Sequence, residues 1–352
     1  MFIIKSKFKN YPVFFEKDYS FIEQWSSKKE FVFVVDSNVW KLHEFLHKLL
    51  PIERTRIEAV CEDWKNLDSV SALYSWLLQF PYKRNLCIVV LGGGILQDVV
   101  GFTASTLYRG ISWIAIPTTL LAQSDSCIGG KTGVNFLGFK NMIGSFYPPC
   151  EVHILTSFTK TLSKNDYFSG LGEIAKAHLM SGEDSAKNFA RLLPNLLLQN
   201  DEILLQCIEQ SLQLKQSYIE ADENDSNLRN MLNYGHCVGH ALESISNFSI
   251  PHGQAVVWGM IFANDFAVHR GLLESVLSSW IFDSVFKPIL LTSLPNFSIT
   301  DVLQAMKQDK KNTGNGLSLI VLCNDFKMQK ISSIEMEEME FILQKKLLYN
   351  DF

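Results

Sequence analysis

The sequence predicts two domains of different class: an α/β domain with a mostly parallel sheet over residues 1–155, then a mainly α-helical domain over 156–352. Strand-length apolar runs alternate with segments of helical period in the first part, which is typical of a parallel sheet covered by helices. From about residue 153 the strand signals nearly vanish and long segments of helical period follow one another. A length of 352 residues also suits two domains.

The first domain is expected to alternate short apolar strands with helices. These elements are strands over 31–35, 87–91 and 111–117 and helices over 70–80 and 95–107. The first strand ends at Asp36, the second runs into Gly92–Gly94, and the third is closed by Pro117. This alternation is the pattern that βαβ units produce.

The second domain is expected to contain one strand among many helices. The helices are expected over 170–181, 184–198, 200–221, 229–245, 253–270, 272–285, 299–309 and 333–348, and the strand over 317–323. No linker rich in Pro, Gly or Ser separates the domains. We therefore expect a tight boundary, with the ligand site in the cleft between the domains.

Composition excludes several classes of partner and compartment. The formal net charge of −5 gives no electrostatic reason to bind nucleic acid or an acidic membrane surface. The N-terminus lacks the apolar run of a signal peptide, and no other run is long enough to span a membrane. The seven cysteines are scattered without a CxxC pair, which argues against disulfides and cysteine-based zinc and favours a reducing cytoplasm.

Three glycines, Gly92–Gly94, join a buried strand to a helix. Such a turn lets backbone approach a phosphate, and the helix N-terminus attracts anions. The dinucleotide fingerprint GxGxxG is not met, because Gln97 occupies its sixth position. Asp98, in the first helical turn, could bond a ribose or amide. A tight turn without a ligand would give the same pattern, so this feature alone leaves both interpretations open.

The stretch PTTLLAQSDSCIGGKTGVNFLGFKNMIGSFY, residues 117–147, gathers polar side chains between apolar flanks. Lys131, Asn135, Lys140 and Asn141 lie within it. Ammonium and backbone N–H groups suit a phosphorylated, polyhydroxylated ligand. A solvated, glycine-rich surface loop is the alternative, but the apolar flanks favour polar residues that point into a cleft.

Three of the eight histidines fall within 17 residues: His236, His240 and His252. The first two are spaced i, i+4, so both lie on one helix face. Cys237 stands where a metalloprotease HExxH motif has its glutamate, which excludes that class. Glu173 from another helix could add an oxygen ligand, leaving an open position for a substrate. The alternative is a group of satisfied polar residues at helix ends.

Several cations accompany these groups. Lys176 follows Glu173 by three residues on the same helix face, and Lys215 and Arg229 flank the acidic stretch 220–226. Each of them alone could be an ordinary surface ion pair.

Taken together, these motifs resemble the 3-dehydroquinate synthase family of sugar phosphate cyclases. The matching stretches are GGGILQDVVGFTASTLYRG, IPTTLLAQSDSCIGGKTGVN, GFKNMIGSFYPP, SGLGEIAK, RNMLNYGHCVGHALE, PHGQAV and DKK, in order between about 62 and 311. Departures are Gly172 where the family usually has alanine, Cys127 in place of a usual serine, and poor matches over 1–30 and 312–352.

The resemblance implies a Rossmann-like NAD-binding domain, a helical domain that holds zinc or cobalt, and a cytoplasmic homodimer. It implies conversion of 3-deoxy-D-arabino-heptulosonate 7-phosphate to 3-dehydroquinate and phosphate, a lyase step of the shikimate pathway. NAD takes and returns a hydride, so the reaction has no net redox change. No nucleic acid or membrane partner is expected.

The resemblance also assigns residues. The metal ligands are Glu173, His236 and His252, whereas His240 faces the substrate. The NAD contacts are Asp36, Glu62, Lys65, Gly93, Gly94, Asp98, Thr118, Thr119, Asp125, Lys140, Phe158 and Thr161. The substrate contacts and catalytic groups are Asp125, Lys131, Asn141, Lys176, Lys215, Arg229, Asn233, His240, Lys310, Lys311 and, across the dimer interface, Arg109.

Three other functions stay open at this point. Aminocyclitol and valiolone cyclases use sugar phosphates without a carboxylate, so Arg229 with Lys215 is the discriminating feature, because a guanidinium can clasp a carboxylate. A polyol dehydrogenase of the glycerol dehydrogenase type would show net NAD reduction and no phosphate release. A non-catalytic descendant would have lost some of these residues.

Overall fold

The structure is a computed structural model, and it describes residues 1–291, 294, 297–308 and 317–347. The chain forms two compact units. Unit 1 consists of Met1–Leu162 and Lys215–Asp225, and unit 2 of Ser163–Leu214 and Ser226–Phe352. The division between the units therefore falls after Leu162, beyond the expected boundary at residue 155, and a short later segment groups with unit 1.

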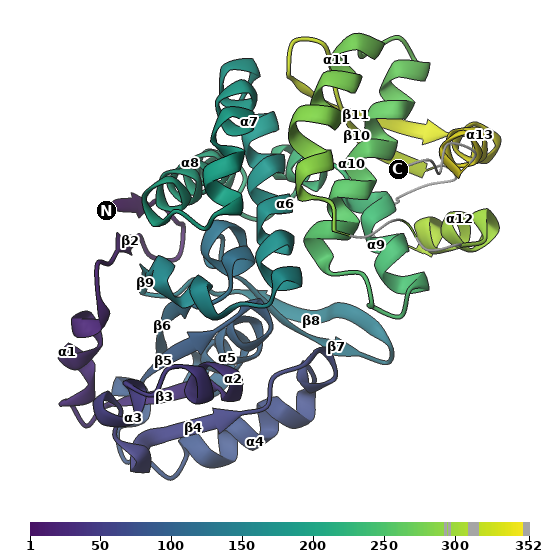
Figure 1. Ribbon diagram of the computed structural model, residues 1–352. Helices are drawn as coiled ribbons and strands as arrows, with labels where there is room; N and C mark the ends of the chain where they lie inside the picture. Colours follow the sequence, from purple (N-terminus) through teal and green to yellow (C-terminus); the bar gives the residue numbers. More distant parts are fainter. Residues whose placement is uncertain (292–293, 295–296, 309–316, 348–352) are drawn as a thin grey trace. The chain divides into compact units, whose positions relative to one another are not determined.

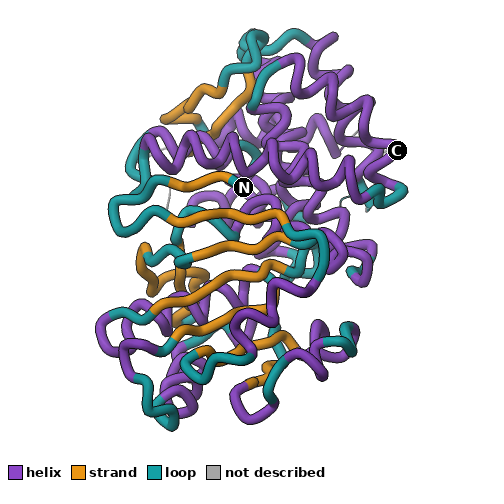
Figure 2. The backbone as a smooth tube through the Cα atoms, turned by 90° about the vertical axis from the view of Figure 1, so that its left-hand side faces the viewer, coloured by secondary structure: helices purple, strands orange, loops and turns teal. Residues whose placement is uncertain are grey.

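Unit 1 is built on a seven-stranded sheet, which Figure 2 shows as neighbouring orange strands. In spatial order the strands are β1 (Phe2–Ile4), β2 (Tyr11–Phe15), β9 (Glu151–Ile154), β6 (Ser112–Pro117), β5 (Cys87–Gly92), β3 (Phe31–Asp36) and β4 (Thr55–Glu58). Only the β1–β2 pair is antiparallel. This confirms the predicted mostly parallel sheet.

The sheet is covered by helices because its central strands are apolar on both faces. Every residue of β5 is buried, as is typical of parallel strands with helices on both sides. The helices of unit 1 are α1 (Glu23–Ser26), α2 (Ser37–Leu42), α3 (Leu46–Leu49), α4 (Leu67–Leu77) and α5 (Gly94–Thr106). The last two match the predicted helices over 70–80 and 95–107.

The polar stretch 117–147 contains regular structure that its sequence did not indicate. It forms an antiparallel hairpin of β7 (Lys131–Phe136) and β8 (Phe139–Phe146), drawn in blue-green in Figure 1. Gly133 and Gly144 face each other in the hairpin, and a Cβ at Gly144 would lie 2.4 Å from the Thr132 carbonyl oxygen. The glycines thus permit close strand pairing here.

Unit 2 is mainly helical, as predicted. Its elements are α6 (Lys164–Met180), α7 (Glu183–Leu197), α8 (Asp201–Ala221, whose end belongs to unit 1), α9 (His236–Ile245), α10 (His252–His269), α11 (Ser275–Ile281), α12 (Ile299–Gln308), β10 (Leu317–Leu322), β11 (Met328–Ile334) and α13 (Met336–Leu347). No helix among the described residues is long and apolar enough to cross a membrane.

Two predicted elements of unit 2 are wrong in their extent. The helix expected over 229–245 is instead a 3-10 turn, Leu228–Asn233, followed by α9, because Gly235 adopts φ +78° and breaks the helical path. The helix expected over 333–348 is preceded by a strand that reaches Ile334. That strand is mostly polar and pairs with β10, so its own sequence carried little strand signal.

Candidate active site

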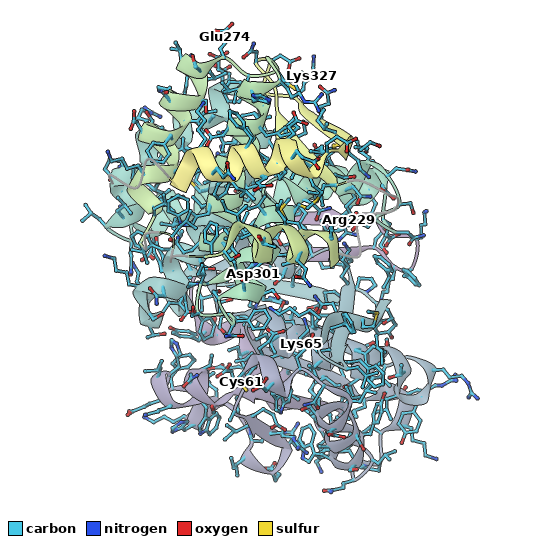
Figure 3. All side chains as sticks on the ribbon, turned by 90° about the vertical axis from the view of Figure 1, so that its right-hand side faces the viewer. Cys61, Lys65, Arg229, Glu274, Asp301 and Lys327 are labelled. Atoms are coloured by element: carbon cyan, nitrogen blue, oxygen red, sulfur yellow. The ribbon has the colours of Figure 1, made fainter. Side chains whose placement is uncertain are left out.

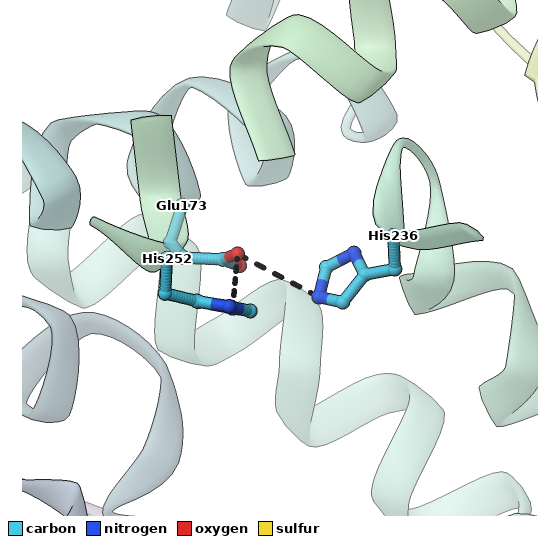
Figure 4. Close-up of side chains that lie close together, drawn as sticks. All are labelled: Glu173, His236 and His252. Carbon is cyan, nitrogen blue, oxygen red and sulfur yellow. Dashed lines mark ion pairs between the residues drawn. The ribbon is translucent and has the colours of Figure 1, made fainter. Parts of the chain in front are cut away.

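Three side chains from three helices of unit 2 converge on one point (Figure 4). Glu173 lies in α6, His236 is the first residue of α9, and His252 is the first residue of α10. The Nε2 atoms of His236 and His252 lie 3.7 and 3.5 Å from Glu173 Oε1. The ligand atoms of the three residues all lie within 4.8 Å of one another.

The other ring nitrogen of each histidine is held by an acceptor. His252 Nδ1 lies 3.0 Å from Glu243 Oε2, and His236 Nδ1 lies 3.1 Å from the Tyr234 carbonyl oxygen. A carbonyl oxygen only accepts hydrogen bonds, so Nδ1 of His236 is the donor and its Nε2 is left for Glu173 or a metal. Such outer partners orient the histidine ligands of metal sites.

Glu173 is a buried carboxylate whose oxygens are not fully used. It is 3% exposed, and among the described residues neither oxygen has a hydrogen bond of regular geometry, although Lys176 Nζ lies 2.5 Å from Oε2. Burial alone would raise the pKa of Glu173, but Lys176 and His252 outweigh it and hold that pKa well below its usual range. An ionised carboxylate beside two imidazole Nε2 atoms fits a divalent metal such as zinc or cobalt.

Glycines beside the three residues allow their helices to approach closely. A Cβ at Gly253 would lie 1.8 Å from the Ser169 carbonyl oxygen, and one at Gly172 would lie 2.4 Å from the Gly253 carbonyl oxygen. A Cβ at Gly235 would lie 2.6 Å from the Val256 carbonyl oxygen. Backbones at these positions are therefore packed with no room for a side chain, which fixes where Glu173 and the two histidines point.

Three other predicted site residues of unit 2 lie among the described residues: His240, Arg229 and Asn233. The ring of His240, one turn after His236 in α9, lies 5.3 Å from the His236 ring and 6.0 Å from the His252 ring. Arg229, labelled in Figure 3, is only 3% exposed, and the Asn233 amide donates to the Asn230 carbonyl. Lys310 and Lys311 lie outside the described residues.

The glycine turn of unit 1 lies at the reversal point of the sheet. From β3 the chain continues to β4 on one side, and β5 then pairs on the other side of β3. A crevice at the carboxyl ends of strands forms where the order reverses, and ligands of such sheets bind there. Asp36 ends β3 and Gly93 ends the turn after β5, so both flank this point. Partial burial raises the pKa of Asp36.

Close packing explains the glycines of the turn itself. A Cβ at Gly93 would lie 2.9 Å from Thr119 Cγ2, and one at Gly94 would lie 3.0 Å from Ser126 Oγ. Thr118 donates its backbone N–H to the Gly92 carbonyl at 3.2 Å. The turn and the residues after β6 thus form one cradle of backbone, ahead of the N-terminus of the 13-residue helix α5.

Further predicted cofactor residues join in polar pairs. Lys65, labelled in Figure 3, is buried and pairs with Asp98, and burial raises the pKa of that carboxyl although the ammonium opposes it. Glu62 accepts from the Asn135 amide at 2.8 Å and lies 3.7 Å from Lys140 Nζ. These contacts tie the segment after β4 to the β7–β8 hairpin.

Three predicted substrate residues of unit 1 form ion pairs, and two others have a positive φ. Lys215 Nζ lies 3.0 Å from Asp125 Oδ1, and Lys131 pairs with Asp225. Asn141 and Arg109 have φ +52° and +64°, in the left-handed region.

Two predicted cofactor residues lie near the core of unit 1. Phe158 is 1% exposed, and its ring belongs to the apolar core. The Thr161 hydroxyl donates to the Phe158 carbonyl at 3.2 Å and contacts the His43 ring nitrogen at 3.0 Å.

Two family models match consecutive parts of the sequence. The model described as 3-dehydroquinate synthase N-terminal matches residues 56–169, and the one described as 3-dehydroquinate synthase C-terminal matches residues 170–312. A relative from Acetivibrio thermocellus named 3-dehydroquinate synthase is 34% identical over 89% of this chain and 89% of its own length.

The chain belongs to the 3-dehydroquinate synthase family.

Solved structures place this member of the 3-dehydroquinate synthase family in a wider fold group. The 2-epi-5-epi-valiolone synthase of Streptomyces hygroscopicus, solved with NAD⁺ and Zn²⁺, is 23% identical with a TM-score of 0.84, covering 96% of this chain and 97% of its own. A 2-deoxy-scyllo-inosose synthase, solved with carbaglucose-6-phosphate, NAD⁺ and Co²⁺, is 22% identical with a TM-score of 0.78, covering 97% and 99%. These likenesses confirm the predicted fold class.

Sequence reasoning about this 3-dehydroquinate synthase family member missed the outer partners of the histidines. Glu243 follows His240 by three residues, so the i, i+3 spacing on one helix face was the available signal. The Tyr234 carbonyl carries no side-chain signal at all. Its role depends on the break at Gly235, which the expected continuous helix over 229–245 concealed.

Proposed function

We propose that this chain is a 3-dehydroquinate synthase that converts 3-deoxy-D-arabino-heptulosonate 7-phosphate to 3-dehydroquinate and phosphate, with NAD and a divalent metal. The observation that carries the proposal is the convergence of Glu173, His236 and His252 in a chain whose relatives of nearly equal length bear that name. The matched regions include every one of these residues.

The metal would be held by Glu173, His236 and His252, and zinc or cobalt suits this donor set. A bound metal would supply Lewis acidity toward substrate hydroxyl oxygens, and NAD would supply a reversible hydride acceptor. The metals in the two similar solved structures, Zn²⁺ and Co²⁺, agree with this proposal.

Unit 1 would hold NAD at the reversal point of its sheet. We propose that the pyrophosphate lies on the turn at Gly93 and Gly94, where backbone N–H groups and the α5 dipole attract anions. The further contacts that we propose are Asp36, Glu62, Lys65, Asp98, Thr118, Thr119, Asp125, Lys140, Phe158 and Thr161. Phe158 can contribute only through its backbone as long as its ring stays in the core.

The substrate carboxylate and phosphate would be bound by cations. Arg229 and Lys215 would bind the carboxylate, because a guanidinium offers two parallel donors to it. Lys131, Asn141 and Arg109 would bind the phosphate. Lys131, which pairs with Asp225, would then have to leave that carboxylate and pair with the substrate phosphate.

Other side chains would manage protons and orientation. His240 would handle proton transfer near the hydroxyl that is oxidised, since a histidine is the side chain best suited to this at neutral pH. Lys176 would keep Glu173 ionised and contact the substrate. Asp125, Asn233, Lys310 and Lys311 complete the proposed set of substrate contacts.

We also propose that the protein is a cytoplasmic homodimer in which Arg109 serves the partner's site. Arg109 and Tyr108 both have positive φ, and Arg109 is exposed. Such backbone strain is retained where function requires a fixed side-chain position. None of the seven cysteines, which all lie among the described residues, forms a disulfide, as a reducing compartment would allow.

One assay tests the proposed function. The purified protein is incubated with NAD, zinc or cobalt, and the heptulosonate phosphate, and inorganic phosphate and NADH are measured. Phosphate release without accumulation of NADH supports a synthase. Accumulation of NADH with a polyol would indicate a dehydrogenase, and turnover only of a sugar phosphate without a carboxylate would indicate another cyclase. A folded, metal-loaded protein that turns over none of these would contradict all three functions.

A further inference from the structure

We propose that Glu243 is a positioning residue for the metal site: it fixes His252 with Nε2 toward the metal and adds negative charge next to it. This inference rests on the proposed function, because it concerns the metal that Glu173, His236 and His252 would hold. Glu243 is not one of those three ligands, and it contacts one of them from the far side of the imidazole ring.

The geometry places Glu243 behind the ligand rather than beside it. Glu243 lies in α9, is 7% exposed, and its Oε2 lies 3.0 Å from Nδ1 of His252 at the start of α10. Nε2 of the same ring lies 3.5 Å from Glu173 Oε1. A carboxylate that accepts from Nδ1–H leaves Nε2 with its lone pair directed at the metal.

The two histidine ligands have anchors of different charge. The anchor of His236 is a neutral carbonyl oxygen, that of Tyr234, whose own hydroxyl donates to Asn264 at 2.6 Å. The anchor of His252 is a carboxylate. An anionic acceptor raises the basicity of the imidazole more than a neutral one does, so Glu243 makes His252 the stronger nitrogen ligand.

Charge around the buried site gives Glu243 a second effect. Lys176 places a positive charge 2.5 Å from Glu173, which opposes the binding of a cation there. The carboxylate of Glu243 adds a negative charge that compensates for the positive charge of Lys176. It does so without occupying a coordination position of the metal. Removal of this charge would therefore weaken metal binding even where all three ligands remain.

A different assignment of Glu243 is also compatible with its neighbours. The ligand atoms of His240, Glu243 and His252 lie within 4.8 Å of one another, so these three could themselves hold a cation. In that arrangement Nδ1 of His252 would bind metal instead of donating to Glu243. The first group is favoured because Oε1 of buried Glu173 lies near Nε2 of both His236 and His252, and the two assignments predict different results for one substitution.

The test is the affinity of the full-length protein for Zn²⁺ and Co²⁺, measured by competition with a chelator and without substrate. Glu243→Gln keeps the shape of the side chain and removes its charge. We expect the dissociation constant to rise about 10- to 100-fold, with the visible spectrum of bound Co²⁺ retaining its coordination pattern. Glu243→Asp, which keeps the charge at a longer distance, should recover part of the affinity.

Tyr167→Phe is the matched control. It removes a buried hydrogen bond from the same unit, that of the Tyr167 hydroxyl to the Leu196 carbonyl, but leaves both Nδ1 acceptors in place. We expect its metal affinity to stay close to that of the unchanged protein. An equal loss in this variant would mean that general loosening explains the effect, and would overturn the proposal.

Three further outcomes of the Glu243 substitutions test the positioning role. Unchanged affinity in a folded Glu243→Gln protein overturns the positioning role. Loss of metal as complete as in His236→Ala, with a changed Co²⁺ spectrum, makes Glu243 a ligand and also overturns it. If Glu243→Gln does not fold, the Glu243→Asp protein carries the same comparison. The unchanged protein, assayed for metal binding and phosphate release, reports separately on the proposed function.

Discussion

At the scale of residues, we propose separate roles for the two histidines that share one face of α9. The i, i+4 spacing of His236 and His240 suggests a pair of ligands, but the group whose ligand atoms meet at Glu173 consists of Glu173, His236 and His252. We expect His236→Ala to lose the metal. His240→Ala should keep it and lose about 100-fold or more in kcat, the size of a general acid–base contribution. Elemental analysis beside the phosphate-release assay measures both, and loss of metal from His240→Ala would contradict the assignment.

Proton release on metal binding follows from the electrostatics of His252. Burial alone would lower the pKa of His252, but Glu243 and Glu173 outweigh it and raise that pKa to about 10 in the metal-free protein. Below that pH the ring is protonated, and a metal must displace the proton from Nε2. We expect about one proton to be released at pH 8, with affinity falling as the pH falls.

Calorimetry in buffers of different ionisation enthalpy measures this release. A binding enthalpy that does not depend on the buffer would show that His252 is already neutral. The His236→Ala protein is not a suitable control, because it lacks one of the proposed metal ligands. The comparison is therefore made on the unchanged protein at pH values above and below 10.

Whether a site residue could be predicted from the sequence depends on whether it contributes a side-chain ligand, a backbone atom or a contact behind a ligand. Glu173, His236 and His252 would contribute side-chain ligands, and residue type with family resemblance was enough to predict these three residues, which the structure brings together. The partners of their far ring nitrogens were not selected, because one is a backbone carbonyl and the other, Glu243, looks like an ordinary helix residue. Their roles depend on the direction of the imidazole rings, which only the folded chain sets.

At the scale of elements, glycines determine how closely α10 meets its neighbours. A Cβ at Gly253 would lie 1.8 Å from the Ser169 carbonyl oxygen of α6. Gly253→Ala must therefore move one helix, and we expect a loss of about 1–3 kcal/mol of stability, or more, with weaker metal binding because His252 is the neighbouring residue. Thermal unfolding and chelator competition measure the two effects.

Gly182→Ala is the control for the Gly253 substitution. Gly182 precedes α7, and nothing lies within 4 Å of a Cβ there, although its φ of +108° makes the substitution strained. We expect it to cost stability through the backbone alone and to leave metal affinity unchanged. Equal loss of metal affinity in both proteins would contradict the claim that helix approach positions His252.

Elements with strong periodicity were predicted well, and elements held by distant partners were not. The helices α4, α5 and α10 and the strands β3, β5 and β6 carry their signal in their own residues. The strand β11 and the β7–β8 hairpin are mostly polar or glycine-rich, so their strand character comes from pairing. The break before α9 depends on a single positive φ at Gly235, which a helix pattern tolerates in the sequence.

At the scale of the whole molecule, the change near residue 153 from alternating strand and helix patterns to helix patterns did indicate a change of structural class. It could not show that the end of α8 groups with unit 1, because that grouping comes from contacts far apart in the sequence. Gln216 donates to the Ile3 carbonyl and Glu220 accepts from the Lys5 backbone, both more than 200 residues away. The end of α8 thus contacts the N-terminal segment of unit 1 through partners that no local pattern reveals.

We propose that NAD acts catalytically on a sugar phosphate in this protein. The most direct measurement supplies the heptulosonate phosphate in large excess over NAD and compares the phosphate released with the NAD added. We expect many phosphates per NAD, no accumulation of NADH, and loss of the reaction when a chelator removes the metal. Phosphate release that stops at one per NAD, or that continues without NAD, would contradict a catalytic role for NAD.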